Sequence, residues 1–172
     1  MILLLLIFVF LFVFFGLVVF LGAPYVPSQK KYVVRAFEHF GVNTKDTVVD
    51  VGSGDGIILR IASSFGARAV GYEINPFLVF ISRLLSIRDT RVKVLLQNFW
   101  FAHLPNETTI VYAFAVTRDG PKLSKLLQSE ANRLGKPLRL ICFGSKIRGV
   151  EPDETFEPCH LYIFHPLQLK NA

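Results

Sequence analysis

Alternate glycines between a β-branched run and a helical pattern constrain the fold of this chain more than any other feature. Residues 47–51 (TVVDV) are typical of a buried strand, and residues 56–65 (GIILRIASSF) have the apolar spacing of a helix. Residues 67–73 (ARAVGYE) predict a second strand. A strand, a glycine turn, a helix and another strand make a βαβ unit, so we expect the two strands to be parallel.

The rest of the chain continues this alternation. The sequence predicts further helices over 29–40, 76–87 and 121–134, and further strands over 91–97, 108–115, 137–144 and 159–166, with a short strand at TFEP beside the last. Ser28 and Asp119 are expected to cap helices, and Pro76 to open one. The expected architecture is an α/β, doubly wound, Rossmann-like sheet covered on both faces. The last strand follows a loop without a helix and should be antiparallel.

The glycine turn at 50–56 reads D-V-G-S-G-D-G. In such sheets the ligand lies outside the carboxyl ends of the strands, and glycine lets the backbone approach it closely. Asp50 and Asp55 would repel the pyrophosphate of a dinucleotide and suit a ligand with a positive group. Glu73 ends the second strand, where a carboxylate can accept the hydroxyls of a ribose. A nucleoside with cationic groups and no phosphate is S-adenosylmethionine (SAM), which is the predicted cofactor; a dinucleotide site and a site that has lost its ligand are the alternatives.

The loop Gln97-Asn98-Phe99-Trp100 follows the third predicted strand and is expected to close over the adenine. Asn98 can accept from the adenine amino group, and an aromatic ring can stack on the base. Alternatively, Phe99 and Trp100 belong to the core or to a membrane interface. The predicted cofactor-binding residues are Asp50, Gly52, Ser53, Gly54, Asp55, Gly56, Glu73, Asn98 and Phe99.

The first 23 residues contain no charged side chain. As a helix they would span roughly 34 Å, enough to cross a hydrocarbon core. A secretory signal peptide would have a basic start and a shorter apolar core, and here Pro24 follows the best cleavage position. The sequence therefore predicts a transmembrane anchor over 1–23 and a second domain over 24–172.

Basic residues follow the predicted anchor and none precedes it: Lys30, Lys31 and Arg35 lie just beyond its end. The positive-inside rule then predicts a single-pass membrane protein with its main domain on the cytoplasmic side. The net charge of +6 is scattered and forms no basic tract. We therefore expect an anionic membrane surface, and no nucleic acid, as its partner. Cys142 and Cys159 lack metal-ligand spacing, so buried free thiols and no metal are expected.

Several of these segments together resemble the small membrane-anchored lysine methyltransferases, which in eukaryotes modify the ADP/ATP carrier and the c-subunit of ATP synthase and have prokaryotic relatives. The marks are A-P-Y-V-P at 23–27, D-V-G-S-G-D-G at 50–56, G-Y-E-I-N-P-F-L-V at 71–79, and the aromatic-Trp pair after the third strand. The resemblance covers about residues 20–165. It implies a class I methyltransferase fold, with SAM contacts at Asp50, Gly52, Gly54, Gly56 and Glu73.

The chain departs from this family at two places. Asn98 stands where the family usually has aspartate, and Ala115-Val116-Thr117-Arg118 stands where it tends to have a Val-Pro pair. The second loop faces the substrate in this fold, so substrate choice is the least transferable property.

The resemblance implies methyl transfer to a lysine of a membrane-embedded protein. The lysine must lose its proton from a pKa of about 10.4, and desolvation in an apolar mouth lowers that pKa. A strong base is not required and the sequence assigns no catalytic residue; for each of the four histidines a structural or surface role is favoured. Tyr25 and Trp100, with Asn98, are expected to line the acceptor channel. The alternatives are a methyltransferase acting on a lipid or small amphiphile, and a non-catalytic SAM-binding protein.

Overall fold

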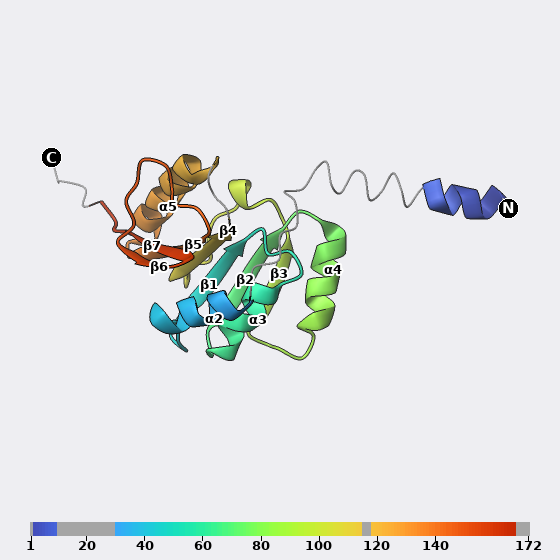
Figure 1. Cartoon of the computed structure of the whole chain (residues 1–172), viewed down its shortest axis with the longest axis horizontal. Helices are drawn as coiled ribbons and strands as arrows, with labels where there is room; N and C mark the ends of the chain where they lie inside the picture. Colours follow the sequence, from blue (N-terminus) through green and yellow to red (C-terminus); the bar gives the residue numbers. More distant parts are fainter. Residues whose placement is uncertain (1, 10–29, 115–117, 168–172) are drawn as a thin grey trace.

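Seven strands form one sheet in the computed structural model, which describes residues 2–9, 30–114 and 118–167 (Figure 1). The strands are β1 (Thr47–Val51), β2 (Arg68–Glu73), β3 (Val92–Leu96), β4 (Ile110–Phe114), β5 (Leu138–Phe143), β6 (Glu154–Phe156) and β7 (Cys159–Phe164). Their order is β3-β2-β1-β4-β5-β7-β6. β1 to β5 pair in parallel, whereas β7 is antiparallel to both of its neighbours. The predicted doubly wound sheet with a late antiparallel strand is thus confirmed.

The helices lie where the sequence pattern placed them, with ends that differ by one or two residues. They are α2 (Lys30–His39), α3 (Ile57–Ser64), α4 (Pro76–Leu85) and α5 (Gly120–Leu134). Pro76 opens α4, and the Asn75 side chain caps it by accepting from two backbone amides. Asp119 occupies the N-cap position of α5 but makes no capping hydrogen bond; its carboxylate lies 3.4 Å from Arg118 instead. The short 3-10 helix η1 (Phe99–Phe101) was not predicted.

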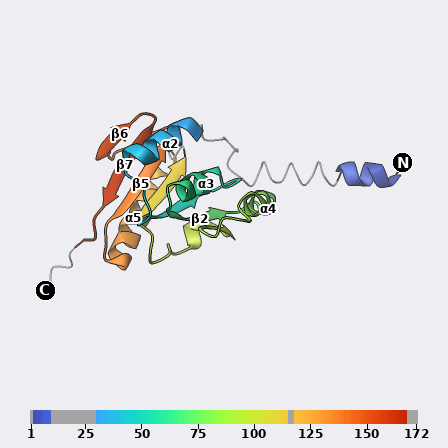
Figure 2. The same ribbon diagram turned by 90° about the horizontal axis from the view of Figure 1, so that it is seen from below.

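The core has two layers, one on each face of the sheet. Successive residues of β1 alternate between them, with Val48 in one cluster and Val49 in the other. α2, α3 and Val79 of α4 pack on the first face, and α5 packs on the second (Figure 2). Because both faces are covered, a ligand can reach the sheet only at its ends.

The predicted anchor falls mostly outside the described residues. Residues 2–9 are helical with exposed apolar side chains. In the described parts of the chain, no helix is long and apolar enough to span a bilayer. Residues 10–23, Tyr25 and Ser28 lie outside what the structure describes.

The two cysteines lie on neighbouring strands, Cys142 on β5 and Cys159 on β7. Both are free and buried, as predicted. Burial raises the pKa of each thiol to about 12. Neither thiol is therefore a ready nucleophile at neutral pH.

Candidate cofactor and substrate site

The glycine turn folds over the carboxyl end of β2. The backbone amides of Gly52 and Ser53 both donate to the Tyr72 carbonyl, at 2.9 and 3.0 Å. The amide of Gly54 donates to Oε2 of Glu73 at 2.9 Å. These bonds bring the end of β2 against the turn that follows β1, so the predicted grouping of turn and acid is present.

The glycines of the turn have different tasks. Gly52 has φ +92°, and a Cβ there would meet nothing within 4 Å. Gly56 has φ +78°, but its Cβ would lie 2.0 Å from Oγ of Ser82 on α4. Gly52 thus leaves open backbone for a ligand, whereas the bareness of Gly56 serves close packing between the turn and α4.

The Glu73 carboxylate is held in place by three backbone amides. Oε1 accepts from Ile74 and Asn75 at 2.8 Å each, and Oε2 accepts from Gly54. A carboxylate offers about four acceptor positions, so roughly one remains, at Oε2. Glu73 can take a hydroxyl there, while accepting both ribose hydroxyls would require sharing with the amide of Gly54.

Asp50 is the least compensated charge of the site. Its side chain is 3% exposed, and no donor in the described residues bonds its carboxyl group. Burial, followed by repulsion from Glu73 and Asp55, raises the pKa of Asp50 to about 8. A buried carboxylate without a partner is unfavourable. A cation at this position would remove the penalty, and that is the charge a SAM ligand carries.

Asp55 makes contacts within the chain that the sequence did not predict. Its Oδ1 accepts from the amide of Ile57 at the start of α3, and its Oδ2 lies 3.7 Å from Arg60. Arg60 also donates to the Asp55 carbonyl at 2.7 Å. The charge of Asp55 is therefore compensated by Arg60 of the same chain. Of the two aspartates expected to attract a cationic ligand, Asp50 is the one without such a partner in the described residues.

Ser53, another predicted cofactor residue, is buried, and its hydroxyl has no hydrogen-bond partner in the described residues. A Cβ built on Gly71 of β2 would lie 2.4 Å from that hydroxyl. The side chain therefore points at the sheet, and only the backbone of Ser53 belongs to the turn.

The loop after β3 is tied to the acid site, because the amide of Gln97 donates to the Glu73 carbonyl at 3.0 Å. Oδ1 of Asn98 accepts from the Trp100 amide at 3.0 Å and so begins η1. The exposed Asn98 side chain keeps one acceptor position for an adenine amino group. Phe99 is 6% exposed and packs edge-to-face on Tyr72, so it is a core residue, and the prediction that its ring stacks on adenine is not supported.

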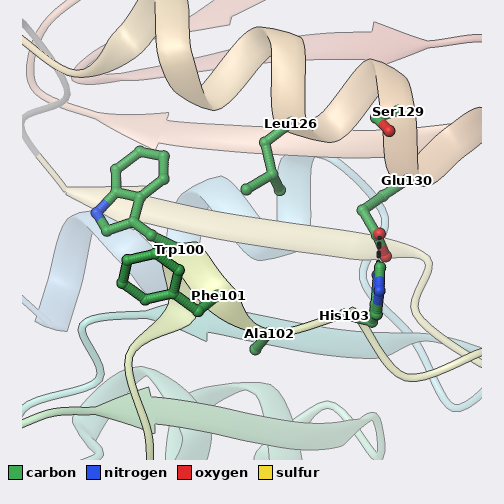
Figure 3. A pocket seen from close by; sticks show the side chains of 7 residues that line it. All are labelled: Trp100, Phe101, Ala102, His103, Leu126, Ser129 and Glu130. Carbon is green, nitrogen blue, oxygen red and sulfur yellow. Dashed lines mark hydrogen bonds and ion pairs between the residues drawn. The ribbon is translucent and has the colours of Figure 1, made fainter.

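Trp100 borders a hollow of about 310 Å³ between η1 and α5 (Figure 3). The hollow is lined by Trp100, Phe101, Ala102, His103, Leu126, Ser129 and Glu130. Nζ of Lys122 lies 4.1 Å from the centre of the Trp100 ring, so this ring already holds an ammonium group. Phe101 is 87% exposed. The α5 wall and Phe101 were not predicted as parts of a site, because nothing in the sequence pairs the 97–101 loop with α5.

Glu130 and His103 close the far end of this hollow, joined at 2.9 Å (Figure 3). Burial alone would raise the pKa of Glu130, but hydrogen bonds from Arg133 and then His103 hold it below its usual range. The other histidines also have structural surroundings. His39 bonds Glu154 at 2.6 Å, His160 is buried beside Thr155, and the His165 carbonyl accepts from Gln128. These contacts favour structural roles, and no general base is assigned.

Comparisons with known proteins agree with this geometry. A protein-lysine N-methyltransferase from Saccharolobus islandicus is 33% identical over 140 residues, which cover 78% of this chain and 84% of that protein. The lysine N-methyltransferase of the ATP synthase c-subunit from Xenopus laevis is 36% identical over 110 residues, covering 62% of this chain and 48% of that protein. The chain thus spans about half the length of that vertebrate relative. No family model matches.

The fold is also found among solved structures. An RNA methyltransferase from Salinibacter ruber, in complex with S-adenosyl-L-homocysteine, superposes with a TM-score of 0.74 at 26% identity. The match covers 86% of this chain and 98% of that one. Its ligand is what SAM becomes after losing its methyl group, and the buried acids and open glycine turn described above fit SAM as the cofactor. By its sheet, its site and its similarity to the Saccharolobus protein, the chain belongs to the protein-lysine N-methyltransferase family of SAM-dependent enzymes.

Proposed function

We propose that this protein transfers a methyl group from SAM to a lysine side chain of a membrane-associated protein. The observation that carries the proposal is the buried Asp50 beside Glu73 at the carboxyl end of the sheet, which receives no hydrogen bond from the part of the chain that the structure describes. Family membership supports a lysine as the acceptor.

The residues around the turn would divide the work of holding the cofactor. SAM, when bound, supplies a methyl group on a positively charged sulfur. Asp50 compensates positive charge, and the open backbone at Gly52 allows close approach. Glu73 offers Oε2 to a ribose hydroxyl, and Asn98 offers an acceptor to adenine. The main contribution of the protein is to fix these groups, because positioning can be worth about 7 to 11 kcal/mol.

The hollow beside Trp100 is the proposed place for the acceptor lysine. The Trp100 ring attracts an ammonium group, as its contact with Lys122 demonstrates. An incoming lysine would compete with Lys122 for that ring. Phe101 and Leu126 supply an apolar part of this lining, away from the Glu130 carboxylate, and an apolar surrounding disfavours the charged form of the lysine and eases loss of its proton.

Membrane placement is the second part of the proposal. It is supported by the uncharged residues 1–23 and by the basic residues that follow them. We place the protein in the membrane as a single-pass protein with the methyltransferase domain on the cytoplasmic side. A tether of this kind raises the effective concentration of a membrane-embedded partner. The name of the Xenopus relative gives a component of ATP synthase as its substrate, which suits such a placement.

The experiment that tests the proposal follows a radioactive methyl group from SAM. Membranes from a strain lacking this protein are incubated with the purified full chain, and label is measured in protein, lipid and RNA fractions. The expected result is a discrete labelled protein band whose modified lysine is located by mass spectrometry. Glu73→Ala should abolish the label, whereas Glu38→Ala, at an exposed acid of α2, should leave it unchanged.

RNA is a second candidate substrate, because the Salinibacter structure with the same fold is an RNA methyltransferase and the chain carries a net charge of +6. Label in nuclease-sensitive material would favour this candidate over a protein substrate. Label only in lipid would point to a small amphiphile as acceptor. No label in any fraction, with cofactor binding intact, would favour a non-catalytic SAM-binding protein.

A further inference from the structure

Helix α4 turns an apolar face away from the sheet. Phe80 is 63% exposed and Leu84 is 56% exposed, and with Phe77 they have the spacing i, i+3, i+7 of one helix face. The buried residues of α4, Val79 and Ser82, lie on the opposite face. The face of α4 that packs on the sheet thus has small side chains, and the face with large apolar side chains is exposed to solvent.

The exposed face continues beyond the helix. Ile87, just after α4, is 76% exposed. On β3, Leu96 is 54% exposed and lies on the same side of the strand as Val94, which packs in the same cluster as Val79 of α4. β3 is the edge strand of the sheet, and α4 lies at the end opposite β6 (Figures 1 and 2). We call Phe80, Leu84, Ile87 and Leu96 the α4 surface.

Arginines border this surface. Residues 74–91 contain Arg83, Arg88 and Arg91, all exposed, against one acid, Asp89. The Arg83 guanidinium donates to the Val94 carbonyl, which holds it beside β3. Within the described residues none of the three arginines forms a salt bridge. The segment thus combines large apolar side chains with uncompensated positive charge.

We propose that the α4 surface lies in the headgroup region of an anionic lipid bilayer. Phenylalanine and leucine on one helix face with arginine at its margin is the pattern of an interfacial helix. Each arginine near an anionic surface contributes about 1 kcal/mol of attraction. A second copy of the chain fits less well, because a two-fold interface pairs the same surface on both partners and so brings two sets of these arginines into one interface. The uncharged residues 1–23 independently indicate that a bilayer is near.

This contact would orient the site. Glu73 is followed directly by Ile74 and α4, and Leu96 pairs with Glu73 across the sheet. The α4 surface therefore adjoins the proposed cofactor site. A single point of attachment alone would leave the domain free to rotate, whereas a second contact holds the carboxyl end of the sheet near the lipid headgroups. The inference goes beyond methyl transfer and holds for any acceptor at the membrane surface.

The test uses the full chain in vesicles of phosphatidylcholine with phosphatidylglycerol. A polarity-sensitive fluorophore is attached to Phe80→Cys, and in a matched protein to Lys125→Cys, an exposed position on α5. The native cysteines are buried, with the pKa of each raised to about 12, and should not compete for the label. The expected result is a blue shift and quenching by spin-labelled lipid at position 80 and neither at position 125.

Three outcomes would overturn the proposal. The first is a label at position 80 that remains as water-exposed as the label at position 125. The second is a blue shift that lipid quenchers do not affect and that grows with the number of protein copies per vesicle, which would assign the surface to a second copy. The third concerns charge: Arg88→Glu with Arg91→Glu should reduce quenching at position 80 in anionic vesicles, and unchanged quenching would show that the arginines do not contact the lipid. These measurements report on contact with lipid and do not depend on methyl transfer, so a failure of this proposal can be distinguished from a failure of the proposed function.

Discussion

Two buried aspartates lie four residues apart, at opposite ends of β1, and they differ in their hydrogen-bond partners. Asp46, just before the strand, is 6% exposed and accepts from the Thr109 hydroxyl at 2.7 Å and from Arg139 at 2.6 Å. The amide of Asn43 donates to its other oxygen at 3.0 Å. Asp50, near the carboxyl end, is 3% exposed and receives no hydrogen bond from the described residues.

The difference separates a structural end of the sheet from a functional one. At the amino end, Arg139 also donates to the Phe40 carbonyl, so one network joins β1, β4, β5 and the end of α2. At the carboxyl end, Glu73 and Asp55 repel Asp50, and no cation among the described residues pairs with it. A buried acid that folding holds in its neutral form is retained where a ligand completes the site, at the expense of stability.

Removing the charge of Asp46 should have the largest effect on folding. Asp46→Asn leaves the part-buried Arg139 guanidinium without its carboxylate, and breaking such a pair costs about 3 kcal/mol. We expect urea unfolding to show a lower midpoint and an unfolding free energy reduced by that amount. Cofactor affinity should be unchanged in the folded protein. Glu107→Gln, at an exposed acid, is the control. A midpoint equal to that of the control would mean that the amino-end network does not stabilise the fold.

A substitution at the carboxyl end of the sheet should change cofactor binding. Glu73→Gln weakens a charge-assisted hydrogen bond to the cofactor, worth about 2 kcal/mol. Calorimetric titration should show a loss of SAM affinity of roughly 10- to 100-fold. Glu38→Gln should bind as the parent does. Equal affinity of the two variants would place the cofactor away from Glu73.

Asp50→Asn should stabilise the ligand-free protein, the reverse of Asp46→Asn. The folded pKa of about 8 lies above the ordinary value of 3.8, so folding favours the protonated acid. The penalty from its charge is absent below about pH 4 and grows as pH rises to about 8. We expect a gain on the order of 2 kcal/mol at pH 8 and none at pH 4, measured by urea unfolding. A gain that did not depend on pH would arise from packing and not from charge.

The same shift predicts proton release on cofactor binding. A cation beside Asp50 favours its ionised form and so lowers its pKa. At pH 7, where the free protein is mostly protonated at Asp50, binding should release up to about one proton. Calorimetry in buffers of different ionisation enthalpy measures this number. It should approach zero well above pH 8 and in Asp50→Asn, and a release that persists in this variant would come from another group.

Periodicity and turn chemistry were enough to predict the sheet, the glycine turn and the position of Glu73 at the end of β2. Both are local signals, because the strands and helices alternate within short stretches of chain. What the sequence did not reveal depends on contacts across the chain. The Asp46–Arg139 pair joins residues 93 positions apart, and the hollow beside Trp100 needs α5 as its second wall.

Residue type alone also did not reveal the contacts that two predicted site residues make within the chain. Asp55 was expected to face a cationic ligand, but Arg60, one helical turn further on, is within its reach. Phe99 was expected to be able to stack on adenine, but η1 turns its ring into the core against Tyr72. In both cases the amino acid suits the chemistry, and the local backbone decides where its side chain points.

Two glycines with similar backbones, one in the cofactor turn and one far from it, extend the comparison between functional and structural positions. Gly52 (φ +92°) lies in the cofactor turn and Gly135 (φ +64°) ends α5, and a Cβ on either would meet nothing within 4 Å. Alanine at either position would meet no steric clash, so its cost in stability is only the strain of a left-handed backbone, about 1 to 2 kcal/mol. Gly52→Ala and Gly135→Ala should therefore lower the unfolding free energy by similar amounts.

Their effects on binding should differ. Only Gly52→Ala places a methyl group where the cofactor must approach the backbone, so it alone should also weaken SAM binding, by roughly tenfold for a loss of about 1.4 kcal/mol. Urea unfolding and calorimetric titration of the same two variants measure both quantities. If both variants lost affinity equally, the loss would follow from general destabilisation, and the open space at Gly52 would have no part in binding. A loss confined to Gly52→Ala would show that the carboxyl end of β1 is bare because a ligand lies against it.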